Sequence, residues 1–169
     1  MAGLSGSGKS RAVENCVKDK NTVILNAYPE DFASVKNARR IIGTDNILKF
    51  LNGILENPYK REEKDLLYIV IDELLVLCSC KPVVQAISQL LAVGRHYGVF
   101  LIGISQVSTK TDVPFKQLFS SRASFFQADP SAYSTVLGCN VGDVRLKRRE
   151  FILLSDQLVT GVTYDTQYT

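Results

Sequence analysis

The run Gly3-Leu4-Ser5-Gly6-Ser7-Gly8-Lys9-Ser10 begins at the third residue of a 169-residue chain and has the spacing Gly-x-x-x-x-Gly-Lys-Ser. Its glycines allow the backbone to fold into a concave nest whose N–H groups face phosphate oxygens. A helix that starts at the end of the run adds the positive end of its dipole to the same anion. The spacing therefore predicts a phosphate-binding loop of the Walker A type, or P-loop.

The side chains of this loop have separate expected roles. Lys9 can reach the β- and γ-phosphates of a nucleotide, and the Ser10 hydroxyl can bind a magnesium ion. The expected ligands are therefore ATP and Mg²⁺. The residues expected to contact the nucleotide are Gly3, Ser5, Gly6, Ser7, Gly8, Lys9, Ser10 and Arg11.

A second signal is the pair Asp72-Glu73, which directly follows six apolar residues, 66–71. An apolar run without alternation is typical of a strand that is covered on both faces, as in a parallel sheet. Carboxylates are expensive to bury, but the carboxyl edge of such a sheet is where ligands bind. We expect Asp72 to hold magnesium through water, and Glu73 to polarise the water that attacks the γ-phosphate, as in a Walker B motif.

A second apolar run, 99–104, ends in Ser105-Gln106. If both runs are strands of one parallel sheet, Gln106 lies beside Asp72 and Glu73. A neutral amide at that position can contact the γ-phosphate or the attacking water. Gln106 is therefore predicted to sense whether ATP is present.

The remaining pattern alternates strands with helices, and no repeat or change in composition marks a domain boundary. It predicts an α/β fold with a mainly parallel sheet flanked by helices, in a single domain spanning 1–169. A β-hairpin is expected to join 150–154 to 158–164 at the end. Helices are expected at 10–18, 45–56, 82–95 and 131–137, and strands at 22–26, 66–71, 99–104 and 123–126.

P-loop ATPases place a hydrophobic strand immediately before the loop, but only Met1-Ala2 precede Gly3 here. The sheet is therefore expected to lack its middle strand. Either the sequence is truncated at its start, or another segment or chain fills the gap.

Composition sets weaker bounds. The net charge of +3 is too small to prove a nucleic-acid partner, although 145–149 holds four cations in five residues, a density that attracts phosphate. No apolar run reaches the ~18–20 residues needed to span a bilayer. The start of the chain does not read as a signal peptide. These features predict an intracellular protein that does not itself cross a membrane.

The segment 94–106 resembles the helix–turn–strand of the FtsK/HerA superfamily of DNA-pumping ATPases, in which an arginine and a glycine precede a strand that ends in a sensor glutamine. The P-loop and Asp72-Glu73 are also similar to that family, as are 121–125 and 138–143. The likeness covers about 3–154. It implies a RecA-like P-loop NTPase of the ASCE type, a homo-oligomeric ring of five or six subunits with ATP between neighbours, and double-stranded DNA through its centre.

The resemblance also gives roles to two arginines. It implies that Arg95, just upstream of the sensor strand, reaches the γ-phosphate of the adjacent subunit, with Arg122 as the second candidate. For both, an ordinary surface salt bridge is the alternative. The DNA-contact candidates are 109–111, which follow Gln106, and the basic run 145–149.

Four functions remain open at this stage. The first is a viral or phage genome-packaging motor, which is favoured because the chain lacks the large appended domains of chromosome translocases. This function implies a viral portal or membrane protein as a partner, and a location in the host cytoplasm or the virion. The second is a plasmid-transfer or conjugation motor. The third is a nucleotide-binding ring subunit without motor activity, and the fourth a small-molecule kinase, which the acid pair and Gln106 disfavour.

Overall fold

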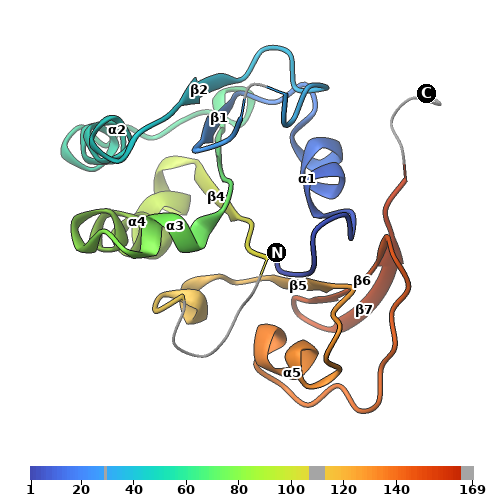
Figure 1. The fold of residues 1–169 in the computed structure, drawn as a ribbon. Helices are drawn as coiled ribbons and strands as arrows, with labels where there is room; N and C mark the ends of the chain where they lie inside the picture. The colour runs from blue at the N-terminus through green and yellow to red at the C-terminus, as the bar shows by residue number, and fades with distance from the viewer. Residues whose placement is uncertain (29, 107–112, 165–169) are drawn as a thin grey trace.

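The computed structural model describes residues 1–28, 30–106 and 113–164 (Figure 1). It contains two β-sheets that meet at the amino terminus, with helices packed against each. The expected α/β fold with a parallel sheet flanked by helices is confirmed.

Four strands form a parallel sheet in the order β2–β1–β3–β4. Their bounds are Thr22–Leu25 for β1, Arg39–Ile41 for β2, Leu67–Ile71 for β3 and Val99–Gly103 for β4. β1 is buried throughout, and β3 is buried apart from one half-buried residue. This is the burial expected of central parallel strands, and it explains their apolar runs.

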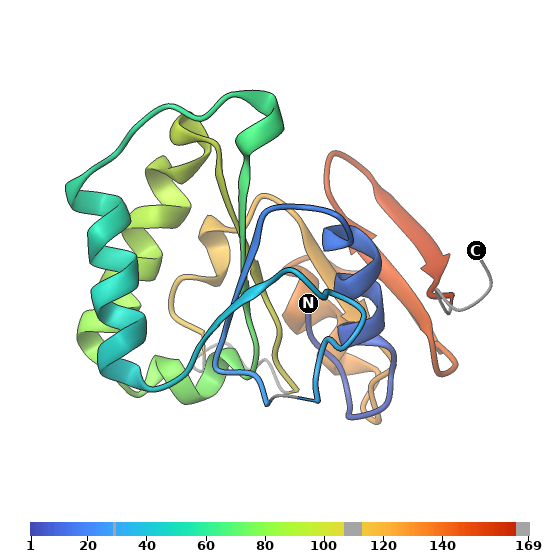
Figure 2. The ribbon, with the colours of Figure 1, turned by 90° about the horizontal axis from the view of Figure 1, so that it is seen from above.

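Helices cover both faces of the parallel sheet (Figure 2). On one face lie α2 (Thr44–Glu56), α3 (Leu74–Cys78) and α4 (Lys81–Val93), whose apolar side chains form the larger core with those of the strands. On the other face, α1 (Lys9–Val17) packs with side chains of 27–38. The sheet is therefore the middle of three layers.

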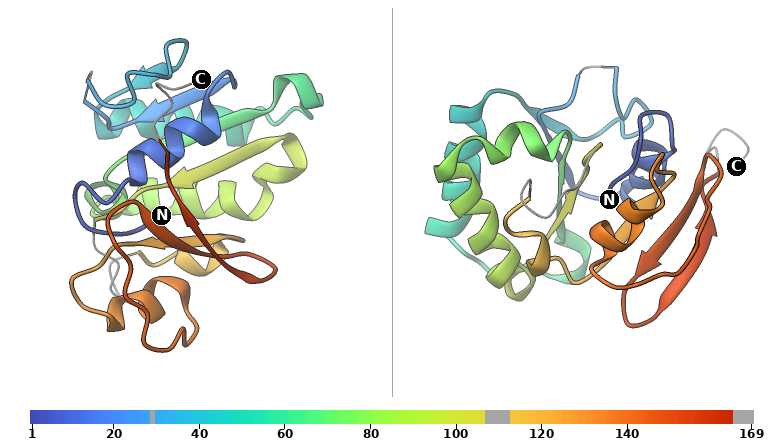
Figure 3. Two further views of the ribbon diagram at one scale, coloured as in Figure 1. Left: turned by 90° about the vertical axis from the view of Figure 1, so that its right-hand side faces the viewer. Right: turned by 60° about the horizontal axis from the view of Figure 1, so that its bottom comes forward.

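The second sheet is antiparallel, in the order β5–β6–β7, and lies beside α1 (Figure 3). Its strands are Arg122–Phe125, Glu150–Leu154 and Leu158–Val162. The helix α5 (Ser131–Leu137) packs on one face of this sheet, and Ala12 of α1 packs on the other. The helix α1 therefore contacts both sheets.

Met1 and Ala2 lie between β4 and β5 and join the two sheets. The Ala2 N–H donates to Ala123 O (2.9 Å), and the Phe125 N–H donates to Ala2 O (2.8 Å). On the other side, the Ser105 N–H donates to Met1 O (2.9 Å). These contacts are isolated parallel bridges, so within the described residues no strand precedes the P-loop, as expected.

The predicted helices and strands are confirmed to within a few residues, including the hairpin, now β6 and β7. Two elements were missed: β2, with only three residues, and α3, whose five residues are too few to show a helical period. Three 3-10 turns complete the described chain: η1 (Glu63–Asp65), η2 (Gly94–Tyr97) and η3 (Lys116–Leu118). No helix in the described ranges has both the length and the apolarity to cross a membrane.

The larger core provides a test of the packing. Leu51 of α2 is fully buried, whereas Leu55, one turn later, is only partly buried in the same core. We expect Leu51→Ala to lower the free energy of unfolding in urea by about 2–5 kcal/mol, because it removes buried methyl groups and leaves a cavity. The matched control Leu55→Ala should cost clearly less. Equal losses would contradict this packing.

Candidate nucleotide-binding site

The loop Gly3–Gly8 contains two glycines that a larger residue could not replace without a clash. A Cβ atom on Gly3 would lie 2.7 Å from Phe125 Cβ. Gly8 has a φ of 103°, and a Cβ there would lie 2.7 Å from Thr163 Oγ1. The loop is therefore fixed by close packing against the antiparallel sheet and the segment after it, as well as by its own backbone.

The amino end of α1 lacks the partners that a helix usually has. Gly8 precedes it without a side-chain cap, and the first turn contains no acidic residue. The hydroxyl of Ser7 is buried and has no hydrogen-bond partner. Uncapped N–H groups at the positive end of a nine-residue helix are suited to bind an anion such as phosphate.

Lys9 occupies the inside of the loop. Its Nζ donates to Gly3 O (2.7 Å) and Leu4 O (2.9 Å), and its side chain is buried. Burial lowers the pKa of Lys9, while the charges of Glu73 and Asp72 oppose that shift. The ammonium group is therefore close enough to the acid pair for the loop and the carboxylates to form one site.

Asp72 and Glu73 follow β3 at the carboxyl edge of the parallel sheet, as the sequence indicated. The Asp72 N–H donates to Leu25 O at the end of β1 (3.0 Å), and the Leu74 N–H donates to Ile104 O just after β4 (2.8 Å). These bonds tie the turn after β3 to both neighbouring strands. The acid pair is therefore held between the ends of both neighbouring strands.

The pKa of Asp72 is raised to about 6, mainly by burial and in smaller part by the charges of Glu73 and Asp31. Asp31 was not identified from the sequence. It lies in the segment after β1, where Arg40 Nη2 donates to Asp31 O (2.6 Å). The sequence could have indicated Asp31 by its position after the neighbouring strand β1, because the carboxyl ends of adjacent parallel strands lie at one edge of the sheet.

Glu73 has a left-handed backbone, with φ 48° and ψ 56°. This conformation costs a non-glycine residue roughly 1–3 kcal/mol and often occurs at functional sites. The Gln106 Nε2 donates to Glu73 Oε1 at 2.6 Å. The structure thus brings the predicted sensor and the predicted base into direct contact.

Asp72 and Ser10 are the residues predicted to hold a hydrated magnesium ion. Asp72 is a buried carboxylate with negative neighbours, so a divalent cation beside it would relieve the repulsion. The described part of the chain has no group of three or more His, Cys, Asp or Glu side chains suited to a metal. Magnesium commonly has only one or two protein ligands and takes the rest from phosphates and water, so the two-residue set stays a prediction.

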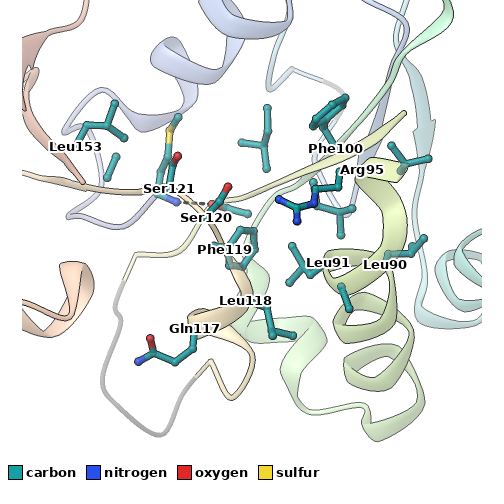
Figure 4. A pocket seen from close by; sticks show the side chains of 17 residues that line it. Leu90, Leu91, Arg95, Phe100, Gln117, Leu118, Phe119, Ser120, Ser121 and Leu153 are labelled. Carbon is teal, nitrogen blue, oxygen red and sulfur yellow. Dashed lines mark hydrogen bonds between the residues drawn. The ribbon is translucent and has the colours of Figure 1, made fainter. Parts of the chain in front are cut away.

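The two predicted trans arginines do not contact the P-loop of their own chain. Arg95 is exposed in η2, before β4, and thus at the opposite edge of the sheet from Gln106. Figure 4 shows its guanidinium pointing into a hollow beside β4. Arg122 donates from Nη1 to Gln117 Oε1 (3.4 Å). A role for either in a neighbouring subunit stays a prediction.

Residues 149 and 163–164 pack against the P-loop and α1, which the sequence did not indicate. The Arg149 N–H donates to Ser7 O (3.0 Å), and the Thr163 N–H donates to Arg149 O (2.8 Å). Asn15 Nδ2 of α1 donates to Tyr164 O (3.0 Å). The last residue of the basic run therefore supports the loop through its backbone.

The remaining DNA-contact candidates are only partly described. Arg145, Lys147 and Arg148 are exposed, and Arg145 Nε lies 3.9 Å from Asp143 Oδ1. The other candidate, 109–111, lies outside the described residues. Neither segment is tested as a DNA contact.

No family model matches this sequence, and no curated protein matches it. Solved structures do match. EssC, ATPases 2 and 3, from Geobacillus thermodenitrificans has a TM-score of 0.76 and 14% identity over 99% of this chain. The conjugation coupling protein TcpA of pCW3, with ATPγS, has a TM-score of 0.75 and 18% identity over 96%. The genome packaging NTPase B204 from Sulfolobus turreted icosahedral virus 2, with ATPγS, has a TM-score of 0.63 and 14% identity over 97%.

These neighbours are ATPases of the FtsK/HerA type, the group that the sequence resembled. The chain has their fold. It spans 40% of the EssC chain and 58% of the TcpA chain, but 94% of the B204 chain. At these identities the likeness establishes the fold, which is that of a P-loop NTPase.

The raised pKa of Asp72 predicts a pH-dependent stability. Between its ordinary value of 3.8 and about 6, the folded chain holds this proton more tightly than the unfolded chain. Ionisation of Asp72 therefore lowers the free energy of unfolding, and the whole of this loss is present above about pH 6. The rise in pKa corresponds to at most roughly 3 kcal/mol. We expect Asp72→Asn to raise Tm by several degrees at pH 8, and the gain to vanish near pH 4.

The measurement is thermal unfolding of both proteins, without nucleotide or metal, across that pH range. The difference between them cancels the titration of all other groups. Asp156→Asn, in the exposed turn between β6 and β7, is the matched control and should follow the wild type. A Tm gain for Asp72→Asn that is the same at pH 4 and pH 8 would disprove the electrostatic origin.

Proposed function

We propose that this chain is an ATPase that binds ATP with magnesium and hydrolyses it, within a single P-loop domain that spans 1–169. The observation that carries the proposal is the meeting of four features at one sheet edge. The uncapped helix α1 begins at Lys9, the charge of Lys9 interacts with those of Asp72 and Glu73, and Gln106 contacts Glu73. The folds of ATPases that hold ATPγS support the same conclusion.

Binding of the phosphates follows from the loop. The N–H groups at the start of α1 and in the loop are donors, and Lys9 adds a positive charge. Lys9 would exchange its bonds to Gly3 O and Leu4 O for bonds to the β- and γ-phosphates. Asp72 and Ser10 would hold magnesium, which supplies positive charge that offsets the charge of the phosphates.

Hydrolysis is assigned to Glu73 and Gln106. The Glu73 carboxylate can orient a water molecule and accept its proton as the water attacks the γ-phosphate. The bond from Gln106 holds one Glu73 oxygen, and the other oxygen would bind the water. The strained backbone of Glu73 places this carboxylate at the sheet edge beside Lys9.

The work coupled to hydrolysis is proposed to be translocation of double-stranded DNA by a homo-oligomeric ring of five or six subunits. Genome packaging by a virus or phage is favoured, because the match to B204 extends over 97% of this chain and 94% of B204. The partners would be DNA and a viral portal or membrane protein, and the location the host cytoplasm or the virion. Transfer of plasmid DNA is the second candidate, supported by the likeness to TcpA.

ATP turnover with and without double-stranded DNA tests this function. The wild-type chain with magnesium should release phosphate faster when DNA is added, and Glu73→Gln should bind ATP but lower kcat by about 10²–10⁴-fold, because the proton acceptor is lost. The matched control Glu63→Gln, in the exposed turn η1, should keep wild-type turnover. Turnover that DNA leaves unchanged would contradict the motor, and turnover that Glu73→Gln leaves unchanged would remove Glu73 from catalysis.

Arg95 provides a test of the ring. Because it lies at the edge of the sheet away from its own P-loop, Arg95→Ala and Lys9→Ala subunits should each be inactive alone. Mixed, they should regain part of the turnover, since some interfaces would pair an intact loop with an intact arginine. Arg39→Ala, an exposed arginine of β2, is the control and should stay active unmixed. The absence of any regained turnover would contradict a shared site.

A further inference from the structure

The outer edge of β7 (Leu158–Val162) is a strand edge without a charged residue. β7 pairs with β6 on one side, and no strand of the described ranges pairs with its other side. It lies at the end of the molecule away from α2 (Figure 2). Its sequence, Leu-Val-Thr-Gly-Val, contains neither the lysine nor the proline by which natural edge strands commonly avoid pairing. This edge is therefore suited to pair with another strand.

Apolar side chains of β7 are exposed on the face of the sheet that α5 covers at β6. Ile152 and Leu154 of β6 pack in the same core as α5. Their partners across the strands, Thr160 and Leu158, lie on the same face but are exposed. Leu158 is 47% exposed and Val162, also on this face, is 65% exposed. The apolar surface of β6 therefore continues onto β7, where the described part of the chain leaves it largely in water.

The outward backbone groups of β7 belong to alternate residues. The Thr163 N–H donates to Arg149 O (2.8 Å), on the side of β6. Opposite residues of an antiparallel pair alternate between those that exchange hydrogen bonds and those whose N–H and C=O groups point away. Alternation back from Thr163 therefore directs the groups of Leu158, Thr160 and Val162 to the outer edge.

These outward groups are self-complementary about Thr160. If a second copy of β7 lies antiparallel with Thr160 opposite Thr160, then Leu158 of each copy lies opposite Val162 of the other. Every one of these pairs is of the kind that exchanges both N–H···O bonds. Any other antiparallel register leaves some of the outward groups unpaired. The same register also brings each exposed Leu158 side chain beside an exposed Val162.

The charges at the two ends of β7 favour the same antiparallel arrangement. Asp156 lies in the exposed turn before β7. At the other end, the exposed Arg148 and Arg149 precede β6, and Arg149 O accepts from the Thr163 N–H. An antiparallel pair brings the acidic turn of each copy toward the basic end of the other, whereas a parallel pair would bring like charges together. The charge pattern therefore selects a second copy as the occupant.

We propose that the outer edge of β7 is a contact between two copies of this chain, related by a two-fold axis beside Thr160. The two antiparallel sheets would join into one continuous sheet, and Leu158 and Val162 would leave water at the joint. A two-fold contact joins chains in pairs, so it is distinct from the head-to-tail contacts that would close the proposed ring. It uses none of the residues predicted to contact the nucleotide, and it stands independently of the proposed ATPase function.

A charge swap at Thr160 tests the two-fold register. In analytical ultracentrifugation without nucleotide, the wild-type chain should form dimers as its concentration rises. Thr160→Lys and Thr160→Glu should each raise the dissociation constant about 10-fold, because like charges would lie directly opposite each other. An equal mixture of the two variants should recover the dimer, since opposite charges would then face each other. Gln85→Lys, on the exposed side of α4, is the matched control and should dimerise as the wild type does.

Hydrogen exchange in the same concentration series gives a second measurement. Exchange at the Leu158, Thr160 and Val162 amides should slow at least about 10-fold as dimers form, whereas the Val159 amide, which points to β6, should change little. A chain that stays monomeric at the highest concentration reached would overturn the proposal. So would a dimer that both Thr160 variants leave unchanged, or a mixture that associates no better than either variant alone. A Thr160 amide that is already protected in the monomer would overturn the second copy as occupant.

Discussion

The peptide groups of Met1 and Ala2 are the joint on which the arrangement of this molecule depends. They accept from Ser105 on the parallel side and bond to Ala123 and Phe125 on the antiparallel side. The P-loop begins at the next residue, so the same few bonds fix both the relative position of the sheets and the origin of the loop. The curvature of the loop then places Lys9 within electrostatic reach of the acid pair.

The sequence predicted best those elements whose residue pattern has a single physical cause. Burial on both faces requires a continuous apolar run, and that requirement made 66–71 and 99–104 readable as neighbouring parallel strands. The meeting of Glu73 and Gln106 followed from their positions at the ends of these strands, and the bond between them is present. The glycine spacing predicted the loop because glycines allow its backbone to curve, and the structure adds that close packing at Gly3 and Gly8 leaves no room for a side chain.

What the sequence did not reveal depends on contacts between distant segments. β2 has three residues, of which only Ile41 is buried, so no pattern distinguishes it from a loop. Asp31 reaches the site because Arg40 bonds to the backbone of its segment. The support of Ser7 by Arg149 joins residues far apart in the chain. The basic run 145–149 would have the same composition whether it contacted DNA or packed against the P-loop, so its composition could not predict this contact.

The contacts of α1 have a mechanical consequence. Its Val13 and Val17 pack on the parallel sheet, while Ala12 packs on the antiparallel sheet. A displacement of this helix along its axis would therefore push on both sheets at once, and the narrow joint at Met1 and Ala2 is the pivot about which they could turn. A charged ligand bound at the amino end of α1, a helix of nine residues, would then act on the angle between the parallel and the antiparallel sheet.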